Sequence, residues 1–115
     1  MSTPAPTASF DLAAGPFRLA AAAPGRFAAV GPLTFASARR ARQIGLEALG
    51  GAGEQRLEID CQGVTISDSA GLAVLLDWLA AARARKRSLR FLHLPAGVVA
   101  LGRISEVSEL LERGV

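Results

Sequence analysis

A strand that runs directly into a long apolar helix, within residues 56–85, constrains the fold of this chain more than any other feature. Arg56-Leu57-Glu58-Ile59-Asp60 alternates polar and apolar side chains, which is typical of a half-buried strand. Val64-Thr65-Ile66 extends this strand towards Ser67-Asp68-Ser69, where a helix begins and runs to about Arg85. One tight apolar stripe lies along that helix, formed by Leu72, Leu75, Leu76 and Leu79. We expect the stripe to face a sheet.

The other segments of the chain predict strands and helices in alternation. In order, they are strands at 17–20 and 26–30 with a turn at Pro24-Gly25, a helix at 34–49 capped by Thr34, a strand at 88–94, a helix at 96–103 and a last helical turn or two at 105–112. The helix at 34–49 has an uneven apolar face, because Arg42 falls in line with Phe35 and Leu49. This order predicts an α/β fold, in which helices pack on a mixed sheet of four or five strands.

Length and composition predict one domain at residues 10–115, preceded by a disordered Pro/Ala/Ser/Thr-rich tail at residues 1–9. The single cysteine, Cys61, excludes an internal disulfide and a multi-cysteine metal site, and its strand context predicts a buried, inert thiol. No apolar stretch is long enough to span a bilayer, and the first residues do not have the pattern of a signal peptide. We therefore expect a cytoplasmic protein.

The chain carries a net charge of +3, and its densest basic run is Arg83-Ala84-Arg85-Lys86-Arg87. A solvated helix end is one interpretation of this run, since cations stabilise the C-terminal end of a helix. Contact with an anionic membrane leaflet or with acidic residues of a partner is the other. The chain has no Tyr, five Phe and one Trp, which leaves few side chains for stacking on bases. We expect no binding of nucleic acid.

The start of the helix at Asp68-Ser69 is the first candidate site. Either side chain can accept hydrogen bonds from the free N–H groups of the first turn, and Gly71 allows another segment to approach closely. Two roles remain open for Ser69, a plain helix cap or a hydroxyl that is phosphorylated or critical for contact with a partner. A phosphate at this position would be favoured by the helix start but repelled by Asp68.

Trp78 is the second candidate, because it lies on the side of the helix away from the leucine stripe. Val74 and Ala81 share that side, with Asp77 and Arg85 beside them. Trp78 either folds under the closing helix or the Phe10 segment, or forms the centre of a partner-binding patch.

The sequence contains no arrangement of residues typical of catalysis. No phosphate-binding G-x-x-x-x-G-K-[S/T] motif occurs, and the only histidine, His93, has no acidic neighbour in its strand-like run. Asp60 and Asp68 suit turns or caps better than an acid/base pair, because no other group converges on them. We therefore expect a non-enzymatic protein that requires no cofactor and no metal.

The segments just described resemble a known family. Leu57-Glu58-Ile59-Asp60, followed by Asp68-Ser69-Ala70-Gly71-Leu72 and Val74-Leu75-Leu76, is similar to the STAS domain, named after sulfate transporters and anti-sigma factor antagonists. The resemblance covers roughly residues 10–112 and implies the STAS fold. Within the family, three features resemble the cytoplasmic subunits of phospholipid ABC transporters: Leu75-Leu76-Asp77-Trp78-Leu79, the basic run at 83–87, and Leu92-His93-Leu94-Pro95.

The resemblance implies two alternative functions. In the transporter subunits, the hydroxyl residue that matches Ser69 lies at the contact with the ATPase, and the ATPase in turn binds a membrane permease. In anti-sigma factor antagonists, the serine that matches Ser69 is phosphorylated by a partner kinase. Both imply a partner-binding surface on the helix, formed by Asp68, Ser69, Gly71, Leu72, Ala73, Val74, Asp77, Trp78, Ala81 and Arg85.

Overall fold

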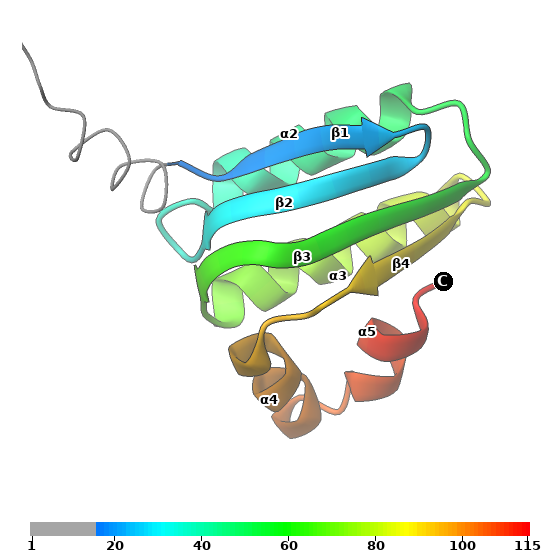
Figure 1. Cartoon of the computed structure of the whole chain (residues 1–115). Helices are drawn as coiled ribbons and strands as arrows, with labels where there is room; N and C mark the ends of the chain where they lie inside the picture. Colours follow the sequence, from blue (N-terminus) through cyan, green and yellow to red (C-terminus); the bar gives the residue numbers. More distant parts are fainter. Residues whose placement is uncertain (1–15) are drawn as a thin grey trace, which may run out of the picture.

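The protein, described by a computed structural model over residues 16–115, forms one four-stranded sheet with helices packed against it (Figure 1). The elements are β1 Arg18–Ala23, β2 Arg26–Leu33, α2 Ala38–Gly51, β3 Arg56–Ser67, α3 Ser69–Ala84, β4 Ser88–Leu92, α4 Ala96–Ile104 and α5 Ser108–Arg113. The strands lie in the order β1-β2-β3-β4; β1 pairs antiparallel with β2, and the other pairs are parallel. The predicted mixed sheet is therefore confirmed.

The predicted order of elements is also confirmed. Ala23 pairs with Arg26 across the turn at Pro24-Gly25, which closes the expected hairpin. The two extended segments expected at 56–60 and 64–66 form the single long strand β3. The tail at 1–9 and the Phe10 segment lie outside the described residues.

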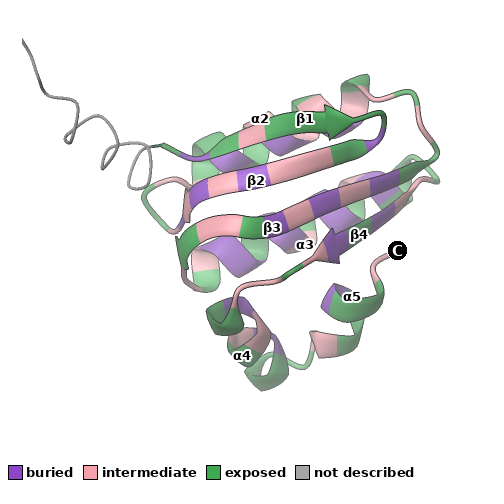
Figure 2. Cartoon of the chain, in the orientation of Figure 1, coloured by how far each residue is buried: buried purple, intermediate pink, exposed green. Residues whose placement is uncertain are grey.

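Helices α2 and α3 lie side by side on one face of the sheet, and α4 and α5 lie beside the β4 edge (Figure 1). The buried residues concentrate where the helices meet the sheet (Figure 2). The largest fully buried side chains are Trp78, Phe17, Leu33, Ile59, Leu75, Leu79, Leu89, Leu111 and Val98. As expected, Cys61 is buried in this core, and burial raises the pKa of its thiol to about 12.

The prediction that Thr34 caps the first helix is wrong, because α2 begins only at Ala38. Residues 34–37 form a turn instead, in which the Ser37 hydroxyl accepts a bond from the Thr34 N–H (3.0 Å) and donates to the Pro32 carbonyl (2.8 Å). Phe35 consequently lies in a loop. Arg42 is exposed, and the buried positions of α2 are Ala41, Gly45 and Leu49.

The partner-patch interpretation of Trp78 is also wrong, because its side chain is 0% exposed. The indole lies between α3 and α2, where its Nε1 donates to the Arg42 carbonyl (3.3 Å) and its ring lies 5.9 Å from that of Phe17. Gly45 leaves the space that the indole fills, since a Cβ at that position would collide with the ring. Helix α3 thus buries two faces, the leucine stripe against the sheet and the Trp78 side against α2. The element that covers Trp78 is α2, rather than the closing helix.

None of the described helices is both long and apolar enough to cross a membrane.

Candidate partner-docking site

The candidate site lies at the end of the sheet where the parallel strands finish and the helices begin. Helix α3 starts immediately after β3, and only Asp68 separates the two. The helix start approaches the end of β2 so closely that a Cβ on Gly71 would collide with the Leu33 carbonyl. The start of α4 lies nearby, because a Cβ on Gly97 would be 3.4 Å from the Ser67 hydroxyl. Three loops therefore converge at one end of the molecule (Figure 1).

The Asp68 carboxylate connects two of these loops. Its Oδ1 accepts from the N–H groups of Ala70 (2.9 Å) and Gly71 (3.1 Å), which caps α3. Its Oδ2 accepts from the N–H of Phe35 at 3.0 Å, in the loop between β2 and α2. The Phe35 N–H, together with the two N–H groups of the helix start, lowers the pKa of Asp68 below its ordinary value, because each bond stabilises the ionised form.

Ser69 is the first residue of α3, and its side chain is exposed. The interpretation of Ser69 as a plain helix cap is wrong, because Asp68 supplies the capping oxygen. Ser69 is therefore exposed at the helix start without capping it, next to a carboxylate that is ionised at neutral pH.

Two large apolar side chains near Ser69 are exposed, and the sequence interpretation did not single them out. Phe35 is 85% exposed, and Ile66, near the end of β3, is 62% exposed. The backbone of Phe35 is held by Asp68, so the loop that carries this ring is fixed to the start of α3. Ala73 is exposed one helical turn after Ser69. We call Phe35, Ile66, Ser69 and Ala73 the Ser69 surface.

The structure separates the sequence-predicted partner residues into exposed and buried groups. Ser69, Ala73, Asp77 and Arg85 are exposed, Asp68 and Ala81 are half-buried, and Gly71, Leu72, Val74 and Trp78 are buried. Asp77 forms an ion pair with Arg42 of α2 at 3.0 Å, so it connects the two helices across their outer side. Gly71, Leu72, Val74 and Trp78 are buried because α3 packs on two faces. Only a narrow strip of the helix is left open to a partner.

His93 has no acidic neighbour along the chain, but the sheet brings Asp60 beside it. In the sheet, Leu92 pairs with Asp60, and His93 Nδ1 lies 3.0 Å from Asp60 Oδ1. The Gln62 N–H and then His93 lower the pKa of Asp60. Both side chains are solvent-exposed and paired with each other, away from the start of α3.

The Ser69 surface offers apolar contacts around one exposed hydroxyl, which suits recognition of a protein. Three backbone N–H groups bond the Asp68 carboxylate and lower its pKa, which makes it a weak base. The buried thiol of Cys61, with its raised pKa, is not a nucleophile at neutral pH.

Comparisons with known proteins agree with this fold. The family described as "Mlab, STAS domain" matches residues 20–112. Among curated proteins, none matches the chain. Two solved structures of the anti-sigma factor antagonist SpoIIAA are similar at 13% identity. The unphosphorylated form has a TM-score of 0.59 and covers 84% of each chain. The phosphorylated form, of the Bacillus cell fate determinant, has a TM-score of 0.62 and covers 86% of this chain and 91% of that one.

These structural likenesses establish the fold, and the family match spans most of the sequence. The protein therefore belongs to the STAS domain family, in the group described as Mlab.

Proposed function

We propose that this chain is a non-enzymatic accessory subunit of a phospholipid ABC transporter, and that it binds the ATPase subunit through the Ser69 surface. In this role it supports the ATPase and, through it, associates with a membrane permease at the cytoplasmic side of the inner membrane. The transport of phospholipid that maintains lipid asymmetry is then the activity of the whole complex. STAS domains are protein-interaction modules, and the match to the group described as Mlab supports this choice within the family.

The observation that carries the proposal is the exposure of two large apolar side chains near Ser69: Ile66, three residues before it in the chain, and Phe35, whose N–H is bonded to Asp68. Exposed aromatic and aliphatic side chains on a rigid support are typical of the centre of a protein interface. The support is rigid here because Asp68 fixes the Phe35 loop to α3. Buried Trp78 has no part in the docking surface.

An alternative function is that of an anti-sigma factor antagonist regulated by phosphorylation of Ser69, with a serine kinase or anti-sigma factor as partner. The exposed hydroxyl at the start of α3 supports this alternative, because a kinase needs access to it. A phosphate on Ser69 would lie beside the ionised Asp68, and the two negative charges would repel each other. This repulsion would weaken the bond from Phe35 to Asp68 and would alter the same surface.

Affinity co-purification from the native host tests the proposal, with proteins identified by mass spectrometry. We expect the wild-type chain to recover an ABC ATPase and a permease, and the Ile66→Ser variant to lose both. Ile104→Ser is the matched control, because Ile104 is 79% exposed at the far end of α4, away from the Ser69 surface. Recovery of a serine kinase, with Ser69 phosphorylated in part of the protein, would favour the alternative. Equal recovery of the ATPase by Ile66→Ser and wild type would contradict the docking surface.

A further inference from the structure

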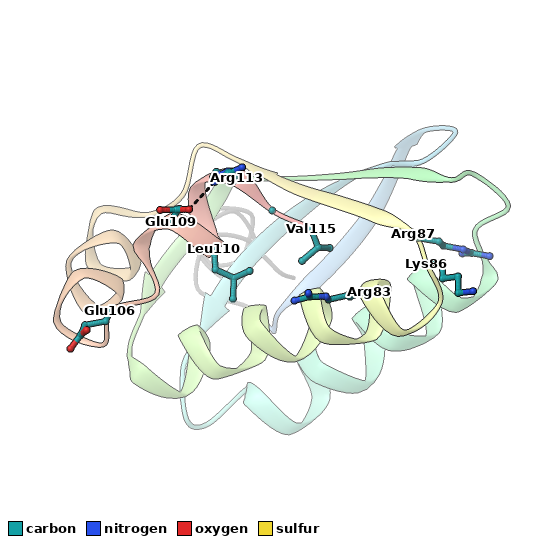
Figure 3. Close-up of a pocket in the computed structure, with 9 residues that line it drawn as sticks. Arg83, Lys86, Arg87, Glu106, Glu109, Leu110, Arg113 and Val115 are labelled. Atoms are coloured by element: carbon teal, nitrogen blue, oxygen red, sulfur yellow. Dashed lines mark hydrogen bonds and ion pairs between the residues drawn. The ribbon is translucent and has the colours of Figure 1, made fainter.

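The two edges of the sheet are protected to different degrees. At the β4 edge, the Val115 N–H donates to the Leu89 carbonyl (3.0 Å), and the Ser88 hydroxyl donates to Val115 O (2.9 Å). The chain after α5 therefore covers part of this edge, and Figure 3 shows Val115 beside the strand. Within residues 16–115, β1 pairs only with β2, so its outer edge is unpaired. Such an edge presents backbone N–H and C=O groups that another strand can bond.

The sequence of β1 has few of the features that usually protect an edge. Arg18, at the first position, is its only charged residue, Leu19 is half-buried, and the last four residues are exposed alanines. Its pairing with β2 is regular from Arg18 to Ala21 and irregular only near the turn. Natural edge strands are commonly blocked by charged residues or proline within the strand. In an antiparallel pair of two β1 strands, alanines would face alanines, and the two Arg18 side chains would lie at opposite ends.

Helix α2 carries its charges in the order that its own dipole disfavours. Its first turn contains arginines and no acidic residue, and its last turn contains no basic residue. Anions are favoured near a helix N-terminus and cations near the C-terminus. Arg42 is compensated by its ion pair with Asp77 of α3. Arg40 and Glu47 are exposed, and neither has an ion-pair partner within residues 16–115.

These two uncompensated charges lie on the side of α2 that is turned away from α3. The helix packs on α3 around Gly45, which faces the indole of Trp78. At 100° per residue, Arg40, Ile44 and Glu47 fall on the other side, each one helical turn from the next. Ile44 is half-buried between the two charges. In Figure 1 this side of α2 lies at the β1 edge of the sheet.

A single two-fold axis can bring both elements against their copies. Figure 1 shows β1 and α2 running in the same direction at this edge. The six residues of β1 span about 20 Å and the fourteen residues of α2 about 21 Å. An axis through the middle of β1, perpendicular to the sheet, would therefore also pass near the middle of α2, at Ile44. Antiparallel copies of α2 would then place Arg40 of one chain near Glu47 of the other.

We propose that the chain forms a symmetric dimer through the β1 edge. The two β1 strands pair antiparallel and join the two sheets into one, and the two α2 helices lie antiparallel on the same face. Arg40 then lies beside the C-terminal half of the second α2, and Glu47 lies beside its N-terminal half. The charge order that is unfavourable within one helix is favourable between two. The proposal does not depend on the partner that binds the Ser69 surface.

Sedimentation equilibrium of the full chain over a range of concentrations tests this dimer. We expect the mass to rise from the monomer value of 11.9 kDa towards twice that value. Ala20→Lys should abolish the rise, because it places two ammonium groups close together across the axis. The matched control is Ala80→Lys, which changes an exposed alanine of α3 and should associate as the wild type does. A wild-type chain that stays monomeric, or equal association of Ala20→Lys and wild type, would overturn the proposal.

Charge reversal on α2 tests the pairing of Arg40 with Glu47. We expect Arg40→Glu and Glu47→Arg each to weaken association about tenfold, because the axis repeats each ion pair, and the double variant to recover. Arg40→Glu should also raise the melting temperature of the monomer at low concentration, since it places an anion at the helix start, which excludes unfolding as the cause. Failure of the double variant to recover would overturn the proposed dimer. So would a monomeric chain in which the ATPase alone protects β1 from hydrogen exchange, because the edge would then bind a strand of that partner.

Discussion

The Asp68 carboxylate accepts the backbone N–H of Phe35 at 3.0 Å, across 33 positions of the chain. This bond holds the loop between β2 and α2 against the start of α3, and it fixes the exposed Phe35 next to Ser69. The same carboxylate caps the helix, so one side chain determines both the helix start and the position of the loop.

We expect Asp68→Asn to separate these two roles. Asparagine is a good helix cap, so Oδ1 can still accept from Ala70 and Gly71. The amide NH₂ that replaces Oδ2 cannot accept from the Phe35 N–H. Hydrogen exchange should therefore accelerate at Phe35 while the first turn of α3 stays protected. Asp68→Ala, the control, should lose protection at both places.

The acid stability of the protein should depend on the same carboxylate. The pKa of Asp68 is lowered from 3.8, first by the Phe35 N–H, and that of Asp60 is lowered in the same direction, first by the Gln62 N–H. A lowered folded-state pKa contributes stability that is present above the unfolded value and is lost as the pH falls through the folded value. We expect the melting temperature to fall below about pH 4. The melting temperature of the Asp68→Asn variant should fall less steeply with decreasing pH than that of the wild type. An equal slope would contradict this role of Asp68.

Trp78 and Gly45 should be coupled in stability. Trp78→Ala removes a fully buried ring and should lower the free energy of unfolding by about 3–5 kcal/mol. Gly45→Ala places a Cβ against the indole, so it should also be strongly destabilising. In the Trp78→Phe background the smaller ring leaves room, and Gly45→Ala should cost much less. Additive effects in a double-mutant cycle, measured by chemical denaturation, would contradict this packing.

The two left-handed helix ends should respond alike in stability. Lys86→Gly and Glu106→Gly each relieve a backbone conformation that costs a side-chain-bearing residue about 1 kcal/mol. We expect each variant to raise the melting temperature, because glycine adopts the left-handed φ of +57° at residue 86 and +61° at residue 106 without that cost. A decrease in melting temperature for both variants would indicate that these side chains stabilise the fold by contacts other than backbone geometry.

The alternation of strands and helices could be predicted from the sequence, because each element has its own periodicity and its own terminal residues. The strand-to-helix junction at Asp68 was predicted for the same reason, although the sequence did not distinguish Asp68 from Ser69 as the cap. At the start of α2, the sequence predicted Thr34 as the cap, but the helix begins only after Ser37. Both residues have hydroxyl groups, and only the fold reveals that Ser37 and Thr34 bond each other in a turn.

The surroundings of Trp78 and Phe35 could not be predicted from periodicity. Periodicity identifies the faces of a helix but not the elements that cover them, so the sequence was compatible with either a buried or an exposed Trp78. The space for the indole comes from Gly45, 33 positions earlier in the chain. Phe35 presents the opposite case, since an aromatic residue is expected in the core and only the delayed start of α2 leaves it exposed.

The most direct test of the account is hydrogen exchange of this chain, with and without the ABC ATPase that we propose as its partner. If the Ser69 surface is the docking site, the backbone amides of residues 34–37 and 66–73 should be protected from exchange in the complex. Exchange in β1 and α5 should not change. Ile66→Ser should abolish that protection, while Ile104→Ser should retain it. Protection confined to other elements, with residues 34–37 and 66–73 unchanged, would contradict docking through the Ser69 surface.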